Sequence, residues 1–243
     1  MSTIKEHDFI ELDYTGTLQE DGMVFDTTDK ETAKEHGLDD GSRTFESLVI
    51  CVGEGHVLPG IDEFLIGKEL GKYKIDIPPE KGFGKRDAKY IQLIPTSKFK
   101  KQGIQPAPGL QVNVDEAMGI VKTVSGGRTI VDFNHPFSGR ALHYEVEAKR
   151  IVTDPQEQIK ALLSVKYGVS IGVSVAEEVC TLKFKQELPD EIKDELKKEI
   201  TRLVAVNDVV FEVEPDQIEQ NKHKEVAHNK PKEVSHDKHE ELN

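Results

Sequence analysis

Short runs of alternating apolar and polar residues mark the start of the chain. Ile10, Leu12 and Tyr14 alternate with acidic side chains, which predicts a strand with one buried and one solvent-facing side. The pair Asp21-Gly22 is a strong hairpin signal, and Val24-Phe25-Asp26 is typical of the returning strand. The chain is therefore expected to open with an antiparallel pair.

Further short elements are predicted up to residue 87. Residues 27–44 are polar and contain two glycines, so we expect a long surface connection before an apolar run at 45–52. Within residues 57–67, apolar side chains fall at i, i+4, i+7 and i+8 on one helical face, which predicts a short helix packed on a sheet. Residues 72–77 alternate again and predict another half-buried strand.

Residues 88–137 differ in character from their surroundings. They carry six basic and three acidic residues, a local charge of +3 in an otherwise acidic chain. Short alternating runs, a helical stretch and the hairpin connection Ser125-Gly126-Gly127 predict a small β-rich unit. Because residues 142–148 resume the earlier strand pattern, we interpret 88–137 as an insertion into a domain formed by residues 1–87 and 138–152.

The last third of the chain has an α-β-β-α-β pattern of its own. Asp154 can cap a helix that Pro155 begins, and Glu157 can bond back to the start of that helix. We expect this α+β domain to occupy residues 153–214. Residues 215–243 lose all periodicity among charged, His and Asn side chains, which predicts a disordered charged tail.

Composition narrows the classes of function. The 243-residue chain has 45 acidic and 32 basic residues, and its net charge of −13 argues against general binding to nucleic acid or to an anionic membrane. No apolar run approaches the roughly 18 residues of a membrane-spanning helix, and the first residues show no secretory signal. With only Cys51 and Cys180, we expect no disulfide framework, no zinc site and a reducing, cytoplasmic location.

Five segments occur in a characteristic order. They are Tyr14-Thr15-Gly16 with Asp21-Gly22 and Phe25-Asp26, then Gly53 with Val57 to Ile61, Pro78 to Gly84, Asn134-His135-Pro136 through Gly139, and Leu142 to Glu147. Together they resemble the FK506-binding proteins, the FKBP-type peptidyl-prolyl isomerases, in their SlyD-like branch, and the last domain is similar to that of the long archaeal members. The resemblance implies an α+β fold: an antiparallel sheet wrapped on a short helix, a small β-rich insert-in-flap domain at 88–137, and a C-terminal α-β-β-α-β domain.

The resemblance also implies a proline-binding pocket. Its catalytic set is Asp26, Tyr14, Phe25, Phe83 and Tyr144, and its substrate-binding set is Val52, Val57, Leu58 and Ile61. Three positions depart from the small members of the family. Ile61 replaces a tryptophan at the pocket floor, Phe83 replaces a tyrosine whose hydroxyl can reach the substrate carbonyl, and Tyr144 replaces a phenylalanine. These departures argue against tight binding of the macrolide FK506. Taken singly, each aromatic residue would be ordinary core.

The chemistry of such a pocket needs no cofactor and no metal. Rotation about an X–Pro bond faces a barrier of about 18–20 kcal/mol that comes from amide resonance. The imide becomes less polar as it twists, so a dry apolar pocket favours the twisted state. The backbone N–H of Leu58 would bind an adjacent carbonyl, and Asp26, held by Tyr14, would supply one polar group.

The SlyD-like resemblance gives the insert a role in capturing unfolded chains for the pocket. Exposed apolar residues would serve this role, and the candidates are Ile91, Leu93, Ile94, Leu110, Val112, Ile120 and Val131. The function predicted is therefore a prolyl isomerase and folding chaperone whose partners are unfolded or proline-containing polypeptides. The alternatives are a non-catalytic holdase on the same frame, an insert closed as a mini-barrel with its apolar faces inward, and an RNA-associated insert.

Two further expectations concern the C-terminal part. A three-stranded sheet in residues 153–214 leaves an open edge, so we expect self-association or partner docking there, without chemistry. The tail contains four histidines at irregular spacing, which favours a solvated tail over a Ni²⁺ or Zn²⁺ site.

Overall fold

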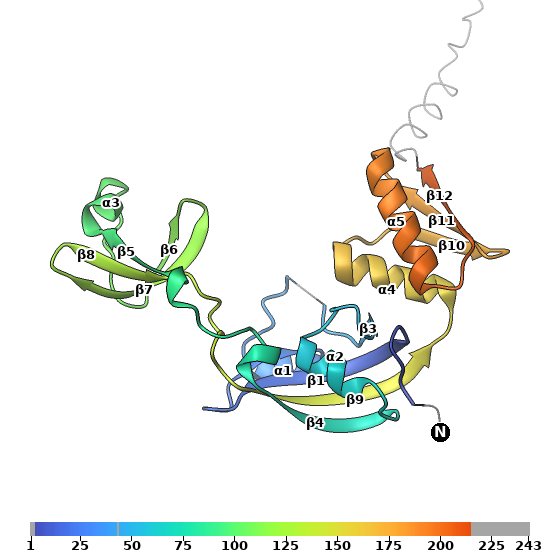
Figure 1. Cartoon of the computed structure of the whole chain (residues 1–243), viewed down its shortest axis with the longest axis horizontal. Coiled ribbons are helices and arrows are strands. Elements are labelled where there is room, and N and C mark those ends of the chain that lie inside the picture. Colours follow the sequence, from blue (N-terminus) through green and yellow to red (C-terminus); the bar gives the residue numbers. More distant parts are fainter. Residues whose placement is uncertain (1–2, 43, 215–243) are drawn as a thin grey trace, which may run out of the picture. The chain divides into compact units, whose positions relative to one another are not determined.

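The computed structural model describes residues 3–42 and 44–214. Packing divides the chain at Gly168 into two units, and each is described by itself (Figure 1). Across the described ranges, no helix combines the length and apolar character needed to cross a membrane. The predicted disordered tail and its histidines lie outside these ranges.

An antiparallel five-stranded sheet forms the main part of the first unit. Its strands are β1 (Phe9–Leu18), β2 (Val24–Thr27), β3 (Leu48–Cys51), β4 (Gly71–Ile77) and β9 (Leu142–Val152). The order is β2-β1-β9-β4, and β3 pairs with the N-terminal half of β1. The strand that follows the insert, β9, lies between β1 and β4 and so belongs to the same sheet as the strands before the insert. The mixed α+β class with antiparallel sheets is confirmed.

The short helix α2 (Pro59–Leu65) covers one face of this sheet (Figure 1). Ile61 and Leu65 are buried against the sheet, and each fully buried side chain of this size contributes about 1.5–3 kcal/mol. A Cβ at Gly60 would lie 2.7 Å from Cγ2 of Ile77, so the helix can approach β4 this closely only with glycine at that position. Pro59 lies in the first turn, where the sequence predicted the helix to begin. Gly67, with a positive φ of 80°, follows the end of the helix, as predicted.

The described part of the predicted surface connection at 27–44 is mostly exposed, but it contains a helix that was not predicted, α1 (Lys30–Glu35). Asp29 caps this helix by accepting a hydrogen bond from the Thr32 N–H at 2.7 Å. Only Ala33 is buried, so six residues with a single small apolar contact leave no detectable periodicity. Two 3₁₀ turns, Pro79–Lys81 and Ala88–Tyr90, were also not predicted.

The inserted region forms a sheet of its own with the order β5-β8-β7-β6. Its elements are β5 (Ile91–Pro95), α3 (Thr96–Lys101), β6 (Gln111–Val114), β7 (Ala117–Ser125) and β8 (Arg128–Asp132). One face holds a core of Ile94, Phe99, Val112, Val114, Val121 and Val131. Among the described residues β5 and β6 do not pair, so the sheet is open and the closed mini-barrel is not what forms.

The C-terminal elements follow the predicted α-β-β-α-β order. They are α4 (Pro155–Tyr167), β10 (Gly172–Ala176), β11 (Val179–Phe184), α5 (Asp190–Leu203) and β12 (Asp208–Val213). The helix α4 packs on β3 and belongs to the first unit. In the second unit, β10 and β11 are antiparallel and β11 and β12 are parallel.

The start of α4 is only partly as predicted. Asp154 accepts a hydrogen bond from the Glu157 N–H at 3.1 Å, so the expected cap is present. Within the described residues, the side chain of Glu157 makes no hydrogen bond back to the helix start. Its carboxylate instead accepts from Arg150 of β9, with 2.5 Å between Nη2 and Oε1, and a full guanidinium charge outcompetes a backbone amide.

Candidate functional site

Aromatic rings from four parts of the chain gather at one end of the five-stranded sheet. The ring centroid of Phe25 lies 5.8 Å from that of Phe83, 5.9 Å from that of Tyr144 and 4.7 Å from that of Phe137. Tyr14 lies 5.8 Å from Tyr144. All five side chains pack against the core that includes α2. We call this group the aromatic cluster.

The pairing of β1 and β2 explains how two consecutive residues reach the same place. Gly16 pairs with Asp26 and Thr17 pairs with Val24, so Phe25 is an extra residue in β2. Such a bulge interrupts the strict alternation of side chains along a strand. Phe25 therefore joins the rings of the aromatic cluster while Asp26 still faces Tyr14.

The carboxylate of Asp26 is held at the edge of the cluster. The hydroxyl of Tyr14 donates to Oδ2 of Asp26 at 3.0 Å, as the resemblance predicted. Between the two strands, Gly16 of β1 pairs with Asp26 of β2 on one side and with Tyr144 of β9 on the other. The site thus places one carboxylate beside a wall of aromatic rings.

The backbone before α2 is held by an internal carboxylate. Asp62, 6% exposed, accepts hydrogen bonds from the N–H groups of Gly53 at 2.9 Å and Gly55 at 3.0 Å. His56 also accepts from the Cys51 N–H, at 3.0 Å to Nδ1. This loop leads directly into Leu58, whose own N–H has no acceptor within the described residues.

The structure brings the nine predicted residues together, some of them fully buried and others half-buried. Val52 and Ile61 are 0% and 1% exposed, so they form the packed floor. Val57 and Leu58 are half-buried and pack on the same core as the aromatic rings. Asp26 joins the group through its bond to Tyr14.

The sequence analysis missed one residue of the aromatic cluster, Phe137, and one beside it, His135. The ring of His135 stacks on Phe83 at 4.4 Å with an interplanar angle of 10°, and Phe137 packs between Phe25 and Phe83. Both lie in the segment that leads from the insert back to the sheet, and the sequence analysis gave them no role in the pocket. An aromatic residue directly after His135-Pro136 was the available signal.

Asn134 ties the two chain crossings of the insert to each other. Its side chain accepts from the Asp87 N–H at 2.9 Å and donates to the Asp87 carbonyl at 3.0 Å. It also donates to the buried Asp132 carboxylate at 2.7 Å, and Asp132 pairs with Arg86. Nearby, the Ser138 hydroxyl donates to the Phe83 carbonyl at 3.0 Å. These bonds position the His135 and Phe137 rings beside the cluster.

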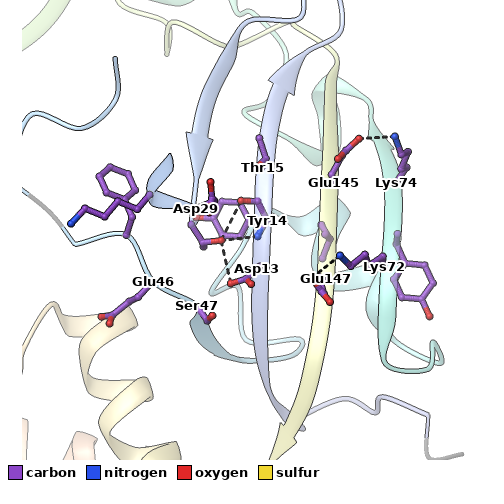
Figure 2. A pocket seen from close by; sticks show the side chains of 15 residues that line it. Asp13, Tyr14, Thr15, Asp29, Glu46, Ser47, Lys72, Lys74, Glu145 and Glu147 are labelled. Atoms are coloured by element: carbon purple, nitrogen blue, oxygen red, sulfur yellow. Dashed lines mark hydrogen bonds and ion pairs between the residues drawn. The ribbon is translucent and has the colours of Figure 1, made fainter. Parts of the chain in front are cut away.

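The described residues also contain a hollow of about 630 Å³ on the opposite face of the sheet (Figure 2). It shares only Tyr14 with the cluster, and its charged or polar strand residues include Asp13, Thr15, Lys72, Lys74, Glu145 and Glu147. Its charges pair across the strands, with 2.6 Å between Lys74 and Glu145 and 3.3 Å between Lys72 and Glu147. These two ion pairs neutralise part of the charge that lines the hollow.

Metal-ligand chemistry has no candidate in the described part of the chain. No group of three or more His, Cys, Asp or Glu side chains there could hold an ion. The aromatic cluster offers apolar walls, one carboxylate and one open backbone N–H. That set suits binding and rotating an uncharged group rather than activating water or a nucleophile.

Comparisons with known proteins agree with this chemistry. Residues 1–100 match the family model described as FKBP-type peptidyl-prolyl cis-trans isomerase, and residues 92–137 match that described as FKBP26, IF domain. A short-type peptidyl-prolyl cis-trans isomerase of Methanocaldococcus jannaschii is 33% identical over 152 residues, which cover 62% of this chain and 96% of that protein.

Two bacterial relatives match smaller parts. A probable FKBP-type 16 kDa peptidyl-prolyl cis-trans isomerase of Pseudomonas fluorescens is 36% identical, over 40% of this chain and 67% of that protein. The FKBP-type peptidyl-prolyl cis-trans isomerase SlyD of Haemophilus influenzae is 29% identical, over 42% and 56%. The chain belongs to the FKBP-type peptidyl-prolyl cis-trans isomerases and is an enzyme of that class.

Proposed function

We propose that the enzyme isomerises X–Pro bonds of unfolded or partly folded polypeptides, and that the aromatic cluster is the proline pocket. The catalytic residues are Tyr14, Phe25, Asp26, Phe83 and Tyr144. Val52, Val57, Leu58 and Ile61 shape the floor and the wall beside α2. The observation that supports this best is the single carboxylate, Asp26, fixed by Tyr14 next to closely packed rings.

The rate gain comes from favouring the twisted imide. Water stabilises the planar, more polar imide, so rings that exclude water remove that preference. The Leu58 N–H binds a substrate carbonyl and fixes the chain on one side of the rotating bond. Each lowering of the barrier by about 1.4 kcal/mol speeds the rotation about tenfold, so a few weak effects of this kind suffice.

We propose that the insert captures the client chain. Large apolar side chains of its strands stand in solvent: Ile91 is 41% exposed, Leu93 56% and Met118 53%. Leu93 pairs with Ile130 across β5 and β8, so these side chains share the face opposite the insert's core. An exposed apolar face beside an open sheet edge suits extended chains of varied sequence.

The capture face differs in part from the residues predicted for it. Ile91 and Leu93 are exposed, and Leu110 is 39% exposed just before β6. Ile94, Val112 and Val131 are instead core residues of the insert, because they lie on its covered face. Tyr90 and Met118 were not predicted and are 48% and 53% exposed.

The division of labour follows the proposed domains. Residues 1–87 with 138–152 carry catalysis, 88–137 carry capture, and 153–214 carry association. We place the enzyme in the cytoplasm, since Cys51 and Cys180 are both buried thiols outside any disulfide in the described residues, as suits a reducing compartment.

One assay with two variants tests the pocket. Isomerisation of a short X–Pro peptide is measured without a coupled protease for the unaltered chain, Asp26→Ala and Phe25→Ala. Both variants should lose roughly tenfold or more in kcat/KM, which corresponds to about 1.4 kcal/mol. Full activity in both variants would show that the pocket lies elsewhere.

A further inference from the structure

Tyr144 carries a hydroxyl where the resemblance predicts none. The side chain is 3% exposed and stands on β9 opposite Gly16 of β1. A Cβ at Gly16 would lie 2.7 Å from Cζ of Tyr144, the atom that carries the hydroxyl. The ring therefore leans across β1 toward Asp26, which pairs with the other side of Gly16.

This hydroxyl is left without an internal partner. In the described ranges no hydrogen bond joins it to any acceptor, and the nearby Asp26 carboxylate accepts from Tyr14 instead. The hydroxyl oxygen is also not fully enclosed by the surrounding atoms. Buried hydroxyls are normally satisfied, because leaving one unpaired is unfavourable. An unpaired donor that is not fully enclosed is available to a bound group.

The surroundings also keep the hydroxyl protonated. Burial raises the pKa of Tyr144 well above its usual value, and the nearby Asp26 and Tyr14 raise it further. A tyrosine held neutral in this way remains a hydrogen-bond donor over the whole working pH range of a protein.

We propose that the Tyr144 hydroxyl donates a hydrogen bond to the imide group of the bound X–Pro substrate as that bond twists. This inference rests on the proposed pocket. As the C–N bond rotates, the nitrogen lone pair becomes localised and can accept a hydrogen bond that the planar imide does not accept. A bond made mainly in the twisted state raises kcat and changes KM little. It also supplies the hydroxyl that Phe83 lacks, from a different wall of the cluster.

The test is Tyr144→Phe, which removes one oxygen atom and restores the residue usual in the small relatives. Peptide isomerisation should show kcat lowered roughly fivefold with KM nearly unchanged. Thermal unfolding should show no loss of stability, because no internal hydrogen bond is removed. A purely structural role would give the reverse, a lowered melting temperature with unchanged kcat.

A matched control and a rescue sharpen the result. Tyr73→Phe removes a hydroxyl from the same sheet that donates to the Glu69 carbonyl at 2.8 Å, and it should leave kcat unchanged. Adding Phe83→Tyr to Tyr144→Phe should restore part of kcat by returning a hydroxyl to the cluster. An unchanged kcat in Tyr144→Phe, or a rise in KM alone, overturns the inference.

The same data set separates this inference from the pocket assignment. If Asp26→Ala and Phe25→Ala lose activity while Tyr144→Phe does not, the pocket stands and only the role of the hydroxyl fails. If none of the three variants loses activity, the pocket assignment itself fails.

Discussion

The two sheets of the first unit share an antiparallel design and treat apolar side chains in opposite ways. In the five-stranded sheet, the strands bury their large apolar residues, and those that are strongly exposed, Met23, Ile66 and Leu70, lie outside the strands. In the insert, Ile91, Leu93 and Met118 are exposed within strands. The five-stranded sheet buries its large apolar side chains near one fixed carboxylate. The sheet of the insert leaves several of its large apolar side chains exposed to solvent.

This difference separates two requirements that compete in a single site. Catalysis needs rings and polar groups fixed to within fractions of an ångström, because only fixed groups favour one twisted state. Capture of many unfolded chains needs an apolar surface without a fixed partner. In the proposed function, joining both in one chain raises the concentration of client near the pocket without loosening the pocket.

The largest expected effect comes from removing the insert. Deleting residues 89–132 and joining the ends with two glycines keeps Asn134, His135 and Phe137, which position or line the aromatic cluster. Refolding of a proline-limited protein should slow roughly a hundredfold, because the local concentration of client is lost. Activity on a short X–Pro peptide should stay near normal.

Comparison of the two substrates in that deletion variant is decisive. An equal loss on both would mean that the insert shapes the pocket, and the contrast between the two sheets would then not correspond to two functions. As a control, circular dichroism must first show that the deletion variant is folded.

The next effect is expected from crowding the cluster. Gly16→Ala places a methyl group 2.7 Å from Cζ of Tyr144 and 3.0 Å from Cζ of Phe25. Both rings must move, so stability should fall by about 1–3 kcal/mol and peptide activity roughly tenfold. Gly172→Ala in β10 is the matched control, since the atoms nearest its methyl belong to the Lys183 side chain and lie at 3.3 Å or more. Normal activity in Gly16→Ala would contradict a tightly packed catalytic site.

A smaller effect is expected on the exposed face of the insert. Leu93→Gln removes apolar contact area without opening the core, and binding to a permanently unfolded protein should weaken roughly fivefold. Peptide isomerisation should not change. Gln92→Ser, one residue away on the other face, is the control and should leave binding intact. Binding is measured by titration with a fluorescently labelled chain, and equal affinity of both variants would remove this face from the capture surface.

Much of the fold was predictable because most of its strands alternate apolar and polar residues and its helices carry local signals. Pro59, Gly67 and Asp154 marked helix ends correctly. Short elements escaped prediction, and α1 has only Ala33 as a buried contact. The competition for Glu157 between a helix cap and Arg150 depends on a residue on β9, so no local pattern could reveal it.

The site was predictable only through the order of its segments. Tyr14, Phe25, Phe83 and Tyr144 come from separate parts of the chain, and periodicity says nothing about which rings meet. The bulge that turns Phe25 toward the cluster is a feature of the pairing of two strands. His135 and Phe137 were missed because their position depends on the bonds of Asn134 across the base of the insert.

The smallest effect on activity should follow truncation after Gly168, which tests the proposed association through residues 153–214. The cut keeps α4, which packs on β3. In the second unit, β12 ends the described sheet and leaves Val210 and Val213 exposed at 42% and 47%. An edge strand with apolar side chains can pair with a second copy.

We therefore expect the full chain to sediment as a dimer and the truncated chain as a monomer. Peptide activity should stay within about twofold, since all residues of the aromatic cluster belong to the first unit. A full chain that sediments as a monomer at tens of micromolar would contradict self-association, and a truncated chain without activity would contradict the independence of the catalytic unit.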